Sequence, residues 1–233
     1  MTIGEPGRQV EARLTLPGST DRISFLLFLP AGYRPAPDPG WPLMIFLHGA
    51  GERGSDLSLV ARHGPPRIAA TRPDFPFVLA SPQCPADAGW EAGRVLSLID
   101  HLVAGLNVDP DRIVLTGLSL GGYGVWAVAA ARPDGFAALL PVCGRGDPAI
   151  APALRHLPAW LFHGEDDDVV PISGSRVMAE ALRAAGASVR FTVFPGVGHD
   201  SWTETYATPE VYDWLLGQRR PDTRRDRGAQ GAD

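Results

Sequence analysis

The chain has 233 residues, 45% of them hydrophobic, which is enough to bury the core of a single α/β domain. Its formal net charge is −5 and the charges are mixed, so we expect no basic face for nucleic acid or an anionic membrane. Residues 1–10 are polar, unlike a secretory signal, and no run approaches the roughly 20 apolar residues of a membrane span. These features favour a cytoplasmic protein.

The chain has only two cysteines, which fits a reducing compartment. Cys84 and Cys143 each end an apolar, strand-like run. In the sheet expected below, their strands lie three positions apart. At about 4.8 Å per strand, a separation of about 14 Å is beyond the reach of a disulfide. The sequence therefore predicts two buried, unpaired thiols.

The first half of the chain alternates between short apolar runs and turns. Residues 10–16 and 23–29 are strand-like and are separated by turn residues, which predicts an antiparallel hairpin. Two further strands are predicted at residues 43–47 and 77–80, and helical spacing follows over residues 92–106.

The second half repeats a strand-then-helix order. Strands are predicted at residues 112–116, 136–142, 159–162 and 189–194, and helices at 123–132, 173–185 and 209–216. Together with the hairpin, this order predicts an α/β fold with a mostly parallel sheet of about eight strands and helices on both faces.

We expect one domain over residues 1–218, followed by a disordered tail over residues 219–233 that is charged and poor in apolar residues. Only 15 residues, 144–158, separate the sixth strand from the seventh. That is too few for a separate lid domain, so the sequence predicts an open site.

A Gly-Leu-Ser-Leu-Gly-Gly motif occupies residues 117–122, between a β-branched strand and an alanine-rich helix. Strand, G-x-S-x-G and helix are the context of a nucleophile elbow, in which a sharp turn strains the serine and lifts its hydroxyl clear of the sheet. Side chains at Gly117 and Gly121 would collide with the neighbouring strand and helix. We therefore predict that Ser119 is a nucleophile; the alternative is a glycine-rich turn that happens to contain a serine.

A serine nucleophile needs a base within hydrogen-bond distance and an acid that orients the base. Functional residues in such sheets lie at the carboxyl ends of strands. His199 follows the last strand through a Pro-Gly-Val-Gly loop that can bring its imidazole over Ser119, whereas His48 and His163 open His-Gly turns where structural hydrogen bonds are expected. We expect the acid to lie in the acidic run at residues 165–168. The local sequence does not indicate which of these four residues it is.

Four motifs together resemble the α/β-hydrolase superfamily: residues 117–122, His48-Gly49-Ala50-Gly51, His163-Gly164-x-x-Asp167-x-x-Val170-Pro171 and Gly198-His199. More narrowly, they resemble its compact serine carboxylesterases, near the phospholipase/carboxylesterase and dienelactone hydrolase-like groups. The resemblance covers about residues 10–216 and implies an α/β-hydrolase fold. It also implies that Asp167 is the triad acid, with Asp168 as the second choice. Dienelactone hydrolases proper use a cysteine nucleophile, and Ser119 departs from that pattern.

The resemblance further implies two donors for an oxyanion, the N–H of Leu120 and the N–H of Ala50, with Gly51 as the alternate to Ala50. Trp90 and Trp202 are each interpreted as a pocket wall or as packing, and we favour Trp90 as the substrate-binding residue. We expect no metal and no other cofactor, since no His/Cys/Asp spacing resembles a ligand set.

These features predict a serine carboxylesterase that cleaves small-molecule esters with short to medium acyl or aromatic groups through an acyl-enzyme. Two alternatives within enzymology are an acyltransferase and a small peptidase that use the same triad. A third alternative, from another class, is a catalytically inactive hydrolase fold that binds a ligand or partner. The sequence predicts no oligomeric state.

Overall fold

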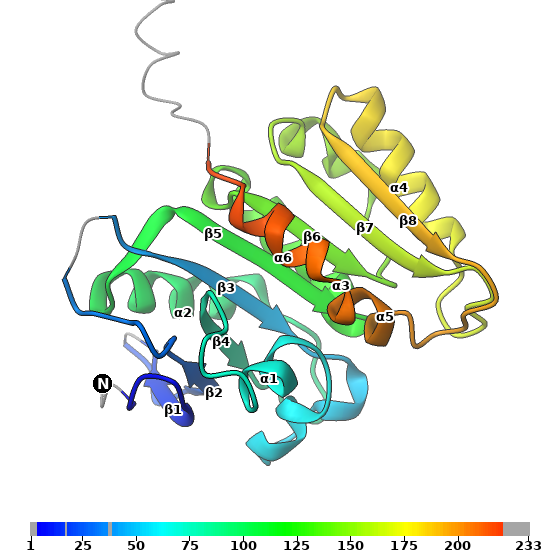
Figure 1. The fold of residues 1–233 in the computed structure, drawn as a ribbon. Helices are drawn as coiled ribbons and strands as arrows, with labels where there is room; N and C mark the ends of the chain where they lie inside the picture. Colours follow the sequence, from blue (N-terminus) through cyan, green and yellow to red (C-terminus); the bar gives the residue numbers. More distant parts are fainter. Residues whose placement is uncertain (1–3, 17, 37–38, 221–233) are drawn as a thin grey trace, which may run out of the picture.

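The computed structural model describes residues 4–16, 18–36 and 39–220, and these residues form one eight-stranded sheet with helices on both faces (Figure 1). The strand order is β1-β2-β4-β3-β5-β6-β7-β8. β1 (Gln9–Thr15) and β2 (Arg22–Phe28) form the predicted antiparallel hairpin, and β2 also pairs antiparallel with β4 (Val78–Pro82). The other pairings in the sheet are parallel, which confirms the predicted architecture.

The remaining strands carry short apolar runs, as expected where both faces of a parallel sheet are covered. They are β3 (Trp41–Leu47), β5 (Val108–Leu118), β6 (Ala138–Val142), β7 (Ala159–Gly164) and β8 (Val189–Phe194). The register pairs Leu47 with Gly117, and Val142 with both Leu118 and Phe162. The residues that follow these strands therefore meet at one edge of the sheet.

The helices divide between two hydrophobic cores, one on each face of the sheet. One core contains α2 (Ala92–Gly105), α3 (Leu120–Ala131) and α4 (Ser173–Ala184); the other contains α1 (Gly64–Ala69), α5 (Trp202–Ala207) and α6 (Pro209–Leu216). Side chains of β3 alternate between them, with Leu43, Ile45 and Leu47 in the first core and Met44 and Phe46 in the second. Figure 1 shows α6 in front of the sheet and α2 behind it.

Two helices, α1 and α5, were not predicted from the sequence. Each has only six residues, which is too short for a helical period to be evident. α1 begins with Gly64, Pro65 and Pro66, and prolines fit the first turn of a helix because the N–H groups there need no partner within the helix. Four short 3₁₀ segments were also not predicted: η1 (Ala50–Glu52), η2 (Leu57–Arg62), η3 (Pro133–Gly135) and η4 (Pro148–Leu154).

The first two residues of the expected tail, Arg219 and Arg220, form ion pairs with the start of β5. Arg219 Nη1 is 2.7 Å from Asp109 Oδ2, and Arg220 Nη2 is 2.6 Å from Asp111 Oδ1. These contacts attach the end of α6 to the opposite end of the sheet from the site. Residues 221–233 of the expected tail lie outside the described residues. Within the described part of the chain, no helix combines the length and apolar character required to cross a bilayer.

Candidate active site

Ser119 lies in a strained turn between β5 and α3. Its backbone has φ 51° and ψ −116°, in a region that residues with a side chain rarely adopt. A Cβ at Gly117 would lie 2.6 Å from the carbonyl oxygen of Gly121, and a Cβ at Gly121 would overlap the carbonyl oxygen of Leu47. The two glycines thus permit the close packing of strand and helix that the sequence predicted for an elbow.

The structure brings Ser119, His199 and Asp167 together, and we refer to them as the candidate triad. His199 Nε2 is 2.9 Å from Ser119 Oγ, and His199 Nδ1 is 2.8 Å from Asp167 Oδ2. The imidazole therefore joins the hydroxyl to the carboxylate, the geometry that serine nucleophiles require. The side chain of His199 is 19% exposed, so the imidazole can exchange protons with a bound molecule or with water.

Asp167 is the buried member of the acidic run, since Glu165, Asp166 and Asp168 are all exposed. Its Oδ1 accepts hydrogen bonds from the N–H groups of Val169, at 3.0 Å, and Val170, at 2.8 Å. Burial by itself would raise the pKa of Asp167, but the hydrogen bonds from His199 and from these two N–H groups outweigh it. The net pKa lies below the ordinary value, so the carboxylate stays ionised beside the imidazole.

A second histidine, His163, contacts the same carboxylate from within the core. Its Nε2 is 3.1 Å from Asp167 Oδ2 and 2.8 Å from the carbonyl oxygen of Val170. Both of these atoms only accept hydrogen bonds, so Nε2 must carry the proton, and Nδ1 then accepts from Ser175 Oγ at 2.8 Å. Burial lowers the pKa of His163, which keeps this tautomer neutral.

The loops that carry Asp167 and His199 pack directly on one another. Asp166 donates its N–H to the carbonyl oxygen of Val197 at 3.0 Å. A Cβ at Gly164 would overlap the carbonyl oxygens of Val197 and Gly198, so only a glycine allows this approach. The acid and the base are therefore positioned as one unit at the ends of β7 and β8.

The loop after β3 lies against Ser119. A Cβ at Gly49 would be 3.7 Å from Ser119 Cβ. Ala50 opens η1 and Leu120 opens α3, and the first N–H groups of a helix have no acceptor within it. Both predicted oxyanion donors are thus at positions where an N–H is available to a ligand.

His48 holds this loop in place through both ring nitrogens. Its Nε2 accepts from the N–H of Cys84 at 3.0 Å, and its Nδ1 donates to the carbonyl oxygen of Gly49 at 2.6 Å. Burial lowers the pKa of His48 from 6.5 to about 4, so the ring stays neutral near pH 7. The expected structural role of this histidine agrees with these contacts.

Trp90 contacts the back of the same loop. Its Nε1 donates to the carbonyl oxygen of His48 at 3.1 Å, and its ring lies edge-on to the His48 ring at 4.8 Å. These contacts support packing, and a place in the substrate pocket stays a prediction. Trp202 instead lies between His199 and His63, at ring distances of 5.2 Å and 5.7 Å, and lines a cavity of about 200 Å³ beside α1.

One group of side chains in the described part of the chain has the residue types of a metal site. The possible ligand atoms of Cys143, Asp167 and His199 all lie within 4.8 Å of one another. Burial raises the pKa of the Cys143 thiol to about 12. Asp167 and His199 already hydrogen-bond to one another at 2.8 Å, so this group of side chains coincides with the candidate triad.

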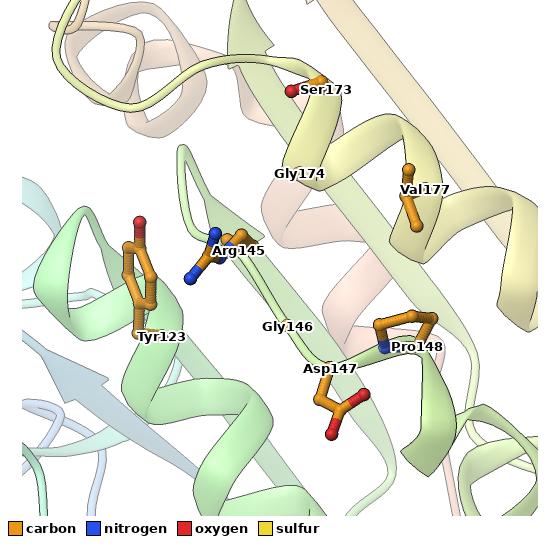
Figure 2. Close-up of a pocket in the computed structure, with 8 residues that line it drawn as sticks. All are labelled: Tyr123, Arg145, Gly146, Asp147, Pro148, Ser173, Gly174 and Val177. Atoms are coloured by element: carbon orange, nitrogen blue, oxygen red, sulfur yellow. The ribbon is translucent and has the colours of Figure 1, made fainter.

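The sequence did not single out Tyr123 and Arg145, which line a cavity of about 590 Å³ between α3, the loop after β6 and α4 (Figure 2). Arg145 follows the carboxyl end of β6, and Tyr123 lies one helical turn after Ser119. The rule that functional residues follow parallel strands would have found Arg145. Nothing in the local pattern distinguishes Tyr123 from a surface residue of α3.

Comparison with known proteins shows sequence similarity to enzymes named as esterases. Acyl-protein thioesterase 1 of Gibberella zeae is 26% identical over 83% of this chain and 96% of its own length. A protein of Nocardia uniformis subsp. tsuyamanensis, named provisionally as the esterase NocK, is 27% identical over 85% of this chain. The chain spans 57% of the length of that relative.

Solved structures show the same fold. A thermostable esterase superimposes with a TM-score of 0.82 at 34% identity, over 93% of this chain and 64% of its own. The feruloyl esterase module of Clostridium thermocellum superimposes with a TM-score of 0.68 at 16% identity, over 89% of this chain and 86% of its own, which shows the fold alone. These matches confirm the α/β-hydrolase fold.

A sequence model of the dienelactone hydrolase family matches residues 90–213. The match spans more than half of the chain and contains all three members of the candidate triad. The chain therefore belongs to the dienelactone hydrolase family.

Proposed function

We propose that the protein is a serine hydrolase that cleaves carboxylic esters. The observation that carries the proposal is the continuous hydrogen-bonded arrangement from Ser119 Oγ through His199 to Asp167, at 2.9 Å and 2.8 Å. Relatives named esterase and thioesterase, together with the esterase structure at 34% identity, support the same class of reaction.

In the proposed reaction, Ser119 Oγ attacks the ester carbonyl carbon while His199 Nε2 takes the hydroxyl proton. Asp167 holds the proton on Nδ1 and stabilises the imidazolium. The N–H groups of Leu120 and Ala50 bind the oxyanion of the tetrahedral intermediate. His199 then gives its proton to the leaving alcohol, and an acyl-enzyme remains on Ser119.

Water completes the cycle. His199 removes a proton from a water molecule, which attacks the acyl carbon, and the proton returns to Ser119 as the carboxylic acid leaves. The reaction consumes one ester and one water and releases one acid and one alcohol. Between β6 and β7, the described chain has only η4 and connecting residues, so the site lacks a lid domain there and suits small esters with short to medium acyl or aromatic groups.

Cys84 and Cys143 are both buried and unpaired, which supports a reducing compartment such as the cytoplasm. Cell fractionation of the producing organism tests this location. Recovery of the protein from the oxidising exterior would contradict it.

The activity is tested with p-nitrophenyl acetate, butyrate, octanoate and palmitate, using the parent, Ser119→Ala and Asp167→Asn. We expect the parent to hydrolyse at least one chain length. Both variants should lose about 10³-fold or more in kcat, because one lacks the nucleophile and the other favours the wrong histidine tautomer. The preferred acyl chain length then indicates the size of the pocket that holds the acyl group.

Asp168→Asn is the matched control, because Asp168 is adjacent but exposed. Its activity should stay close to that of the parent. Activity in Asp167→Asn together with loss in Asp168→Asn would contradict the assignment of the acid. Transfer of the acyl group to an added alcohol, or cleavage of peptides in preference to esters, would favour the acyltransferase or peptidase alternative. A folded parent that neither hydrolyses these esters nor reacts with a fluorophosphonate would favour a binding role.

A further inference from the structure

One buried carboxylate beside the candidate triad has no part in the proposed reaction. Glu52 ends η1, two residues after the predicted oxyanion donor Ala50, and its side chain is only 8% exposed. A Cβ at Gly49 would lie 3.2 Å from Glu52 Oε2 and 3.7 Å from Ser119 Cβ. The carboxylate and the nucleophile therefore pack against the same side of one glycine.

The carboxylate of Glu52 lacks the partners that usually accompany a buried charge. Among the residues that the structure describes, none donates a hydrogen bond to it, and its ion-pair partner, His63, has Nε2 at 3.8 Å from Oε1, beyond hydrogen-bond distance. The neighbouring Arg53 is directed elsewhere, with Nε 3.1 Å from the carbonyl oxygen of Ala50 and Nη1 3.3 Å from that of Ala88. A buried charge without hydrogen bonds is costly, so Glu52 is suited to a partner that the chain itself does not supply.

The segment that carries Glu52 is held in place by the end of β4. Gln83 Nε2 donates to the carbonyl oxygen of Glu52 at 2.9 Å and to that of Asp56 at 2.8 Å, and so spans the connection between η1 and η2. The direction of the Glu52 side chain is thus set before a ligand arrives. A preformed group loses less conformational entropy when it binds.

Two aromatic rings connect Glu52 to the candidate base. The His63 ring lies edge-on to the Trp202 ring at 5.7 Å, and the Trp202 ring lies edge-on to the His199 ring at 5.2 Å. Glu52, His63 and Trp202 therefore form a wall that begins beside Ser119 and ends at His199. A substrate bound to Ser119 would meet a carboxylate and aromatic rings on this side.

We propose that Glu52 binds an ammonium group of the substrate, so that the preferred substrates are esters that carry a positive charge close to the ester bond. A carboxylate accepts charge-assisted hydrogen bonds from an ammonium group, and an indole ring nearby favours the same cation. The charge must lie close to the ester bond because Glu52 and Ser119 pack against the same glycine. This inference rests on the proposed ester hydrolysis and adds a substrate class to it.

The test compares pairs of esters in which an ammonium group replaces an alkyl group of the same shape, by following acid release in a pH-stat at pH 7. Methyl 3-aminopropanoate and methyl butanoate differ in the acyl part. 2-(Dimethylamino)ethyl butanoate and 3-methylbutyl butanoate differ in the alcohol part. We expect the parent to prefer the charged member of one pair by about tenfold or more in kcat/KM, and the pair that shows it identifies which part of the ester lies beside Glu52.

Glu52→Gln keeps the shape of the side chain and removes its charge, so it should lower the charged-to-neutral ratio of kcat/KM about tenfold. Glu52→Asp should retain part of the preference. An ammonium group also activates an ester chemically, but this effect cancels when the ratio of a variant is compared with that of the parent. Glu180→Gln is the matched control, because Glu180 is an exposed glutamate on α4. It makes the same change in net charge and should leave the ratio unchanged.

Two results would overturn the inference while leaving the esterase proposal intact. One is an active parent that turns over the charged and neutral members equally in both pairs, a result that depends on no variant. The other is a charged-to-neutral ratio that survives in Glu52→Gln or falls equally in Glu180→Gln. A folded parent that hydrolyses none of the four esters and does not react with a fluorophosphonate would overturn the proposed function and this inference together.

Discussion

Asp167 is the residue on which most of the polar contacts of the site converge. Two backbone N–H groups bind one of its oxygens, and two imidazoles, from His199 and His163, approach the other. His199 reaches the nucleophile, whereas His163 is fully buried and contacts the acid loop and Ser175 of α4 instead. His163 therefore acts as a positioning residue for Asp167.

Replacement of His163 tests this role. His163→Leu removes the N–H that contacts Asp167 and the Val170 carbonyl, and it should lower kcat about tenfold with little change in KM, since a hydrogen bond to a charged group contributes about 1.5–3 kcal/mol. His163→Gln can replace that N–H and should recover part of the loss. Steady-state kinetics with one p-nitrophenyl ester measure both parameters.

His156→Gln, a substitution at a partly exposed histidine beside η3, is the matched control and should behave as the parent. Equal effects of the Leu and Gln replacements of His163, or an effect on KM alone, would argue against a positioning role. Thermal melts of each variant separate a loss of folding from a loss of kcat.

The elbow between β5 and α3 depends on the glycines that flank Ser119. Strand and helix approach so closely that a Cβ at Gly121 has no room beside the Leu47 carbonyl, which is part of β3 and cannot rotate away. The fold thus requires a glycine where the helix begins.

Gly121→Ala should lower the free energy of unfolding by about 3 kcal/mol or more, because backbone atoms must shift to admit the methyl group. Gly93→Ala provides the comparison, since Gly93 is exposed in α2 and its Cβ would meet no atom within 4 Å. That change should be neutral or raise stability by up to about 1 kcal/mol, as alanine is favoured in helices. Urea unfolding followed by circular dichroism measures both, and similar stability of the two variants would contradict the steric argument.

The elements that the sequence predicted are those whose physical cause is local. The elbow follows from Gly117, Ser119 and Gly121, and the strands follow from apolar runs that need no partner to be recognised. The helices α1 and α5 are short and depend on packing against the second core, so no local period reveals them.

The parts of the site that the sequence predicted also have local causes. Ser119 and His199 each follow a predicted strand, so their positions in the fold could be inferred. The acid needed a family resemblance, because Asp167 differs from Asp168 only in which side of a turn it occupies. The cavity beside Tyr123 was not predicted, because it forms between three segments that are distant in the sequence.

At the scale of the whole molecule, the stability of the fold depends on keeping buried imidazoles uncharged. His48 packs with the loop after β3, and burial lowers its pKa from 6.5 to about 4; burial also lowers the pKa of His163. At His48, the unfolded chain binds a proton below about pH 6.5 that the folded chain excludes until about pH 4. The free energy of unfolding therefore falls as the pH drops from about 6.5 to 4, by about 3 kcal/mol for His48 alone.

His48→Gln should flatten this dependence even if it lowers stability at pH 7, because the group that binds the extra proton is gone. Urea unfolding at pH 7, 6, 5 and 4.5 measures the slope, with His101→Gln on α2 as the comparison. A slope in His48→Gln equal to that of the parent, or one reduced equally in both variants, would show that His48 does not cause it.

The backbone of Ser119 has one more consequence, which concerns selection rather than mechanism. Its φ and ψ are those of the first central residue of a type II′ turn, a position dominated by glycine, and such strain costs about 1–3 kcal/mol for a residue with a side chain. Glycine would adopt the same backbone without that cost. A laboratory evolution experiment that screened this protein for heat resistance alone would therefore favour loss of the serine, and would enrich chains that fold better and carry no nucleophile.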